Sequence, residues 1–227
     1  MGILDFILKK GSAETKGVGP ALYRIARRTF VGSYQADLKR FFSQEKLSDE
    51  QIFSILFEQF LVRLSICYHW LDKAFELGKI TREERDKINV DLTLEIQDLA
   101  CRMASEFQID RYEFFFFTTD KIRTYRASYQ DDMAEEKEEK KSDVQFMKTA
   151  GLILKASLQP VIGKEAKDKS KRKVSSRKAK KGKPRAKEIR DKKKTNELTR
   201  KISQYISPDI WSVTDEVRKM LKGRTML

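Results

Sequence analysis

The stretch from Ser48 to Phe107 constrains the fold most, because it has the pattern of two long helices joined by a very short turn. Apolar residues in both arms recur at steps of three or four, which is the period of a buried helical stripe. In the first arm they are Phe53, Leu56, Phe60, Leu64, Cys67, Leu71 and Phe75, and in the second Ile88, Leu92, Ile96, Leu99, Met103 and Phe107. Helices joined by so short a connection lie antiparallel, so the sequence predicts an all-α fold built around a helical hairpin.

Local signals mark the ends of the two arms. Ser48 with Gln51, and Thr81 with Glu84, have the spacing of a capping box, in which each side chain satisfies a free N–H group of the first turn. Gly78 lies between the arms, and glycine adopts the left-handed conformation that ends many helices at little cost. We therefore expect the first arm to end at Gly78 and the second to begin after Thr81.

Antiparallel pairing about this turn predicts which residues lie level with one another. Arg63 lies level with Glu95, which predicts an ion pair between the arms. Cys67 and Cys101 lie roughly 15 Å apart along the helix axes, whereas a disulfide needs Cα atoms within about 7 Å. We therefore expect two free thiols buried in apolar runs, as is usual in a reducing compartment.

Helical spacing on both sides of the hairpin predicts a bundle domain over residues 20–159. One helix is expected from Pro20 to Phe42. Another runs through the YEFFFFTT motif, whose aromatic cluster is predicted to lie in the core rather than to stack on bases. The charged segment 131–141 is predicted as a solvated extension of that helix or as a hinge. A further helix is expected to begin near Ser142 and to end before Pro160.

The two ends of the chain are predicted to differ from this bundle. Residues 1–19 have the pattern of a short amphipathic segment followed by a loop, without the features of a secretory signal peptide. Residues 195–227 are predicted to form a short helical pair that separates at Ser207 and Pro208, an N-cap followed by a first helical residue. This pair either forms a small unit of its own or docks on the body or on a partner.

Charge is concentrated in one segment of the chain. Residues 164–194 contain 17 Lys or Arg and 4 acidic side chains, a net charge of +13, whereas the remaining residues contain 31 basic and 30 acidic side chains. This segment has too few apolar residues to offset the entropy lost on ordering, so residues 160–194 are predicted to be a disordered linker. The basicity is therefore a property of the linker and not of the predicted helical domain.

A flexible run of cations binds polyanions through the release of counterions, without reading their sequence. We therefore expect a non-enzymatic protein that binds DNA or RNA, in the cytoplasm or, for a eukaryotic source, in the nucleus. The residues predicted to contact phosphates are Lys171, Arg172, Lys173, Arg177, Lys178, Lys180, Lys181, Lys183, Arg185 and Lys187. One alternative is a helical scaffold that docks a protein partner through the helical body or residues 195–223. Another is peripheral association with anionic membranes.

Other chemistries lack the residues that they need. The chain has a single histidine, His69, placed with Asp72 on the narrow polar face predicted for the first arm. A lone His-x-x-Asp pair is more often structural than a metal site, so no metal or cofactor is predicted. No nucleophile elbow, nucleotide fingerprint or zinc spacing occurs in the sequence, so no catalytic residue is assigned. No apolar run approaches the 18 residues of a transmembrane helix.

Overall fold

The computed structural model describes residues 17–30, 32–45, 47–107, 110–138, 145–157 and 186–222. All regular structure in these ranges is helical, so the predicted all-α bundle is confirmed. The helices in chain order are α2 (Val18–Arg27), the 3-10 helix η1 (Arg28–Phe30), α3 (Gly32–Phe41), α4 (Asp49–Glu76), α5 (Arg82–Phe107), α6 (Arg111–Glu138), α7 (Met147–Ser157) and α9 (Ala186–Lys222).

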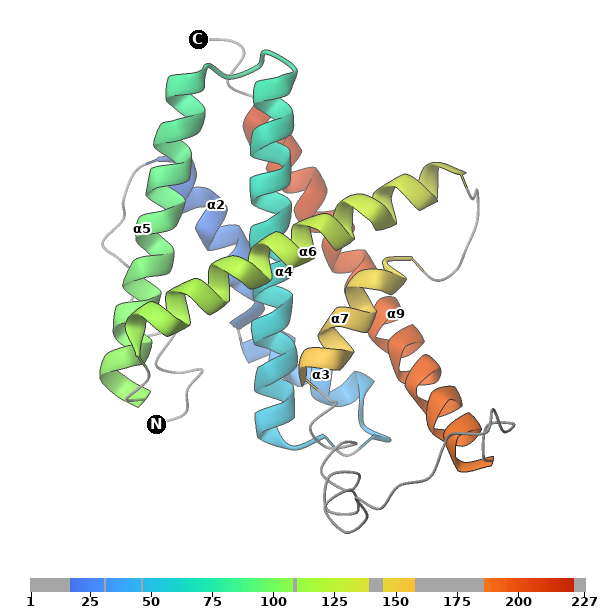
Figure 1. The fold of residues 1–227 in the computed structure, drawn as a ribbon. Coiled ribbons are helices and arrows are strands. Elements are labelled where there is room, and N and C mark those ends of the chain that lie inside the picture. The colour runs from blue at the N-terminus through green and yellow to red at the C-terminus, as the bar shows by residue number, and fades with distance from the viewer. Residues whose placement is uncertain are drawn as a thin grey trace, which may run out of the picture.

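Helix α4 forms the centre of the fold. Helices α2, α6, α7 and α9 all pack against it, and in Figure 1 α6 crosses α4 and α5 on the near side while α2 and α9 lie behind. By length and mean hydropathy, α4 is the one helix in the described ranges that could cross a membrane. However, 78% of its most apolar 18-residue window is buried inside the bundle. The core helix of a globular protein has the same composition, and α4 occupies that position.

The capping residues at the ends of α4 and α5 adopt the conformations that the sequence predicts. Ser48 and Gln51 form a reciprocal capping box, with the Gln51 N–H donating to Ser48 Oγ at 3.2 Å and the Ser48 N–H donating to Gln51 Oε1 at 2.9 Å. Thr81 and Glu84 form the same pair of bonds ahead of α5. Gly78 adopts a φ of +65° between the two helices. These predictions of local structure are confirmed.

The ion pair predicted between the two arms is not formed. Helix α2 packs against both α4 and α5 on one side and α6 crosses both on the other, while direct contact between α4 and α5 is limited. Arg63 therefore pairs with Asp209 of α9 and not with Glu95. The predicted polar face of α4 is also largely covered, because Glu58 and Ser65 are buried together with His69.

Helix α9 replaces the predicted pair of C-terminal helices. It continues without a break through Ser207 and Pro208, and it begins at Ala186, inside the segment predicted to be a disordered linker. A proline inside a helix costs about 3 kcal/mol. Burial of one apolar stripe that crosses the proline offsets this cost, and its members are Ile202, Ile206, Ile210, Val213, Val217 and Leu221. This stripe packs on α4 and α7, so residues 195–222 belong to the body.

Two other predicted helices have different limits in the structure. The helix expected from Pro20 to Phe42 is divided into α2, η1 and α3, and α2 already begins at Val18. The segment from Asp131 extends α6 to Glu138 instead of forming a hinge. Asp110 begins α6 by accepting hydrogen bonds from the N–H groups of Tyr112 and Glu113.

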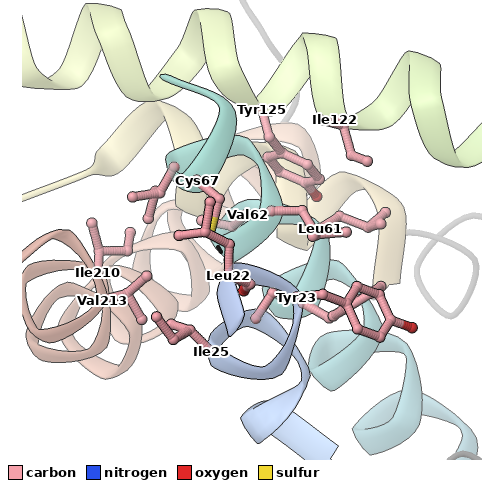
Figure 2. Close-up of a cluster of buried hydrophobic side chains, with 14 of the residues drawn as sticks. Leu22, Tyr23, Ile25, Leu61, Val62, Cys67, Ile122, Tyr125, Ile210 and Val213 are labelled. Atoms are coloured by element: carbon pink, nitrogen blue, oxygen red, sulfur yellow. Dashed lines mark hydrogen bonds between the residues drawn. The ribbon is translucent and has the colours of Figure 1, made fainter. Parts of the chain in front are cut away.

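The core lies where α2, α6 and α9 meet α4. Figure 2 shows side chains from all four helices in one cluster, in which Leu22 and Ile25 of α2 lie beside Val213 of α9 and close to Cys67 of α4. Cys67 is fully buried, and its Sγ lies 3.7 Å from the carbonyl oxygen of Leu22. Both cysteines are free thiols, as predicted, but Cys101 is exposed on α5 and does not fill the core.

This difference in exposure predicts that a thiol reagent such as a maleimide labels Cys101 rapidly and Cys67 only when the protein unfolds. Burial raises the pKa of the Cys67 thiol to about 12, so the reactive thiolate is scarce as well as inaccessible. Mass spectrometry of the labelled protein should show one adduct under native conditions and two in guanidinium chloride. Rapid addition of two labels to the folded protein would contradict this packing of Cys67.

Candidate functional site

The predicted phosphate-binding residues fall almost entirely outside the described ranges. Nine of the ten lie between residues 158 and 185, and Lys187 lies in the first turn of α9, where only the backbone is described. The nearest cations with described side chains are Lys192, Lys193 and Lys194, which are exposed near the start of α9. The phosphate contacts of the basic segment therefore stay predictions. The structure defines only where the segment joins the bundle, at the start of α9.

A second site lies near the opposite end of α9, where α4, α6 and α9 enclose an open groove. Its main part has a volume of about 570 Å³ and is lined by His69, Trp70, Lys73, Gln130, Met133, Ala134 and Arg218. A smaller hollow of about 70 Å³ adjoins it and shares Trp70 and Arg218. It is also lined by Ala74, Leu77, Lys79, Leu221 and Lys222. We call the two parts together the Trp70–Arg218 groove.

Trp70 is held firmly in this groove by polar contacts behind it. Its indole N–H donates to the hydroxyl of Tyr129 at 3.1 Å, and that hydroxyl is hydrogen-bonded to Thr214 of α9 at 3.1 Å. The guanidinium of Arg218 lies 4.8 Å from the centroid of the Trp70 ring, a cation–π contact. The ring is therefore held by contacts with α6 and α9, and it lines the groove.

His69 forms the polar floor beside this tryptophan. Its ring meets the rings of Trp70 and Tyr129 edge-on, with centroids 5.4 and 5.2 Å apart, respectively. The amide Nε2 of Gln130 donates to His69 Nδ1 at 3.1 Å, which places the imidazole proton on Nε2. Burial, reinforced by the charges of Arg126 and Lys73, lowers the pKa of His69 to about 4. The imidazole is therefore neutral at physiological pH and acts as a fixed dipole.

The groove is electropositive. Its described lining contains no acidic residue and four cations, which are Lys73, Lys79, Arg218 and Lys222. One of the four, Lys73, is already paired with Glu76 at 2.5 Å, and the neighbouring carboxylate of Asp72 pairs with Arg126 at 2.7 Å. An anion that enters the groove therefore meets cations around an aromatic wall, a combination that suits phosphates attached to planar bases.

Candidate metal ligands are the next feature to consider in the described residues. Within these ranges no group of three or more His, Cys, Asp or Glu side chains is placed to hold a metal ion. The His69 and Asp72 pair in the sequence does not act as a unit, because His69 bonds to Gln130 and Asp72 to Arg126 and Arg85.

Exposed apolar side chains also occur on α5 and α6, outside the groove. Val90 and Leu94 of α5 are more than half exposed, and so is Tyr112 of α6. Phe116 of α6 is 67% exposed, so the prediction that the YEFFFFTT cluster lies in the core is only partly right. Helical spacing puts Phe114 inward, next to Phe57, and turns Phe116 and Phe117 outward.

The sequence did not reveal the groove, because its residues come from three helices that are distant along the chain. Trp70 has the spacing of a core residue, and Arg218 stands among other cations of the last helix. Only the packing of α6 and α9 on α4 brings them together. Comparisons with protein-family models, with curated proteins and with solved structures found no significant match to this chain.

Proposed function

We propose that this protein binds nucleic acid without catalysing a reaction, and that its basic segment, residues 164–194, contacts the phosphate backbone. The observation that carries this proposal is the separation of charge, a net +13 in this segment against a nearly neutral remainder. Cations at this density displace condensed counterions from any nucleic acid, and the free energy of that release drives binding. Such contacts fix position without selecting a sequence.

The structure supports this proposal through α9, the helix that contains the end of the basic segment. Helix α9 begins at Ala186 and exposes Lys192, Lys193 and Lys194 in its early turns. Further along, its apolar stripe is buried against α4 and α7. A nucleic acid held by the basic segment is therefore attached to the bundle through one long helix, and the groove at the far end of that helix adds cations of its own.

Removing residues 164–185 is expected to abolish most of the binding while leaving the bundle folded, because the deletion stops before α9. It removes 12 basic and 2 acidic residues. The slope of log K against log salt should fall by about 0.7 to 0.9 for each phosphate that the variant no longer neutralises. Fluorescence anisotropy with labelled single- and double-stranded DNA and RNA across a salt series measures affinity and slope together.

The matched control replaces the same residues by a Gly/Ser segment of equal length, which preserves the connection to α9. Circular dichroism should show equal helicity in all three proteins. Equal affinity of the deletion variant and the full chain would refute the role of the segment. Loss of all binding near 0.15 M salt, where the Debye length is about 8 Å, would show that the charge acts only at low ionic strength.

A protein-binding scaffold is the second candidate function, and the exposed apolar side chains of α5 and α6 favour it. Side chains such as Leu94 and Phe116 are large, apolar and more than half exposed, which is common at protein interfaces. The C-terminal residues 195–222, also considered as a docking element, have their apolar stripe buried on the body. A partner of this scaffold would therefore meet α5 and α6.

A further inference from the structure

We propose that the Trp70–Arg218 groove binds an unpaired base and its phosphate, which makes single-stranded nucleic acid the preferred ligand. This inference rests on the proposed function and adds a second, more selective binding site. The basic segment attracts any polyanion, whereas a groove with an aromatic wall accepts only a base that has left a double helix.

The shape and lining of the groove suit a base. Its volume of about 570 Å³ lies within the usual range for small-molecule sites. Trp70 and Met133 supply apolar surface from α4 and α6, while Arg218 stands at the edge on α9. Gln130 uses its amide nitrogen on His69, which leaves its carbonyl oxygen as an acceptor for the exocyclic amine of a base.

The charges suit the phosphate that accompanies a base. Within the described residues, no carboxylate pairs with Arg218, which contacts Trp70 through its exposed guanidinium. Its planar guanidinium stacks on rings and also forms two hydrogen bonds with a phosphate, which a lysine cannot do. Lys73 and Lys79 lie on the α4 side of the same groove. A base against Trp70 would thus have its phosphate within reach of Arg218.

The groove and the basic segment lie along one helix. From Lys194 to Arg218, α9 rises by roughly 36 Å at 1.5 Å per residue. A strand of about 20 nucleotides reaches both sites, whereas one of about 4 nucleotides engages only one of them. The affinity of single strands is therefore expected to rise with length more steeply than that of duplexes, since a duplex offers the protein only its phosphates.

The test uses the full-length chain with the substitution Trp211→Phe. Because the sequence has two tryptophans, Trp70 is then the only one that remains. Oligo(dT) of about 20 nucleotides and a duplex of the same length are titrated while anisotropy and tryptophan emission are recorded. We expect the single strand to quench Trp70 and the duplex to bind without quenching. Because lysine cannot form the paired hydrogen bonds with a phosphate, Arg218→Lys should weaken single-strand binding by about 10-fold, so that quenching requires correspondingly more oligonucleotide, with duplex binding little changed.

Lys219→Gln is the matched control, because Lys219 is an exposed cation next to Arg218 that does not line the groove. It should leave quenching intact. Two outcomes would contradict the groove as a base site: binding of both nucleic acids without quenching, or equal effects of the two substitutions. Neither outcome would contradict the proposed function. If neither oligonucleotide binds, both the proposed function and this inference fail.

Discussion

Replacing Asp209 by Ala is expected to lower the free energy of unfolding by about 3–5 kcal/mol, because the change leaves the charge of Arg63 buried without its partner. The Arg63 side chain is 1% exposed and that of Asp209 is 11% exposed. Arg63 donates from Nε and Nη2 to the two carboxylate oxygens of Asp209, and from Nη1 to the carbonyl oxygen of Ile25 at 3.0 Å. Denaturant unfolding followed by circular dichroism measures the loss.

The Arg28–Glu216 pair provides a matched control for this prediction. It also joins α9 to the N-terminal helices, at 2.7 Å, but its side chains are 53% and 37% exposed. Removing it with Glu216→Ala should therefore cost less than about 1 kcal/mol. Joint replacement by Arg63→Met and Asp209→Leu should recover much of the loss, since no charge is then left buried. Equal effects of Asp209→Ala and Glu216→Ala would contradict the importance of burial.

This ion pair also explains how α9 is held in place. Asp209 accepts a further hydrogen bond from Gln59 of α4 at 2.8 Å, and the Arg63 guanidinium lies 4.8 Å from the centre of the Tyr34 ring of α3. One carboxylate on α9 thus connects to α4 directly and, through Arg63, to α2 and α3. Because α9 carries the end of the basic segment, its attachment determines how that segment is presented.

Local signals in the sequence predicted the ends of the central helices correctly because they depend on neighbouring residues. The capping boxes at Ser48 and Thr81 and the left-handed Gly78 each involve only a few consecutive residues. Periodicity likewise identified α6 despite the strand propensity of its phenylalanines. The prediction that the helix breaks at Pro208 was wrong. The local signal at this proline is outweighed by the burial of an apolar stripe that extends on both sides of it.

The sequence predicted the ends of helices more accurately than it predicted what covers each helix face. Periodicity assigns Glu58 and Ser65 of α4 to a face, but a polar face can meet either solvent or a partner. Here the Glu58 carboxylate accepts a hydrogen bond from Tyr125 of α6 at 2.5 Å and pairs with the Lys121 ammonium at 3.1 Å. Composition alone identified the basic segment. The groove could be identified only from the relative positions of α4, α6 and α9.

His69 is expected to make the protein less stable as pH falls from about 6.5 to about 4. The folded-state pKa is about 4 and the unperturbed value is 6.5, so the unfolded chain binds the proton first. Above pH 6.5 the imidazole is neutral in both states and contributes no pH dependence. Below pH 4 the full penalty is reached, about 3 kcal/mol at 1.36 kcal/mol per pH unit. Denaturant unfolding at several pH values measures this loss.

The variant His69→Gln isolates this effect from the carboxylates that titrate at the lower end of the same range. Because the chain has one histidine, the difference in unfolding free energy between the variant and the wild type belongs to a single imidazole. In the wild type, the imidazole proton resonances should titrate near pH 4 by NMR spectroscopy, far below an exposed histidine. A titration near 6.5 in the folded protein would mean that this side chain is solvated and that Gln130 does not close over it.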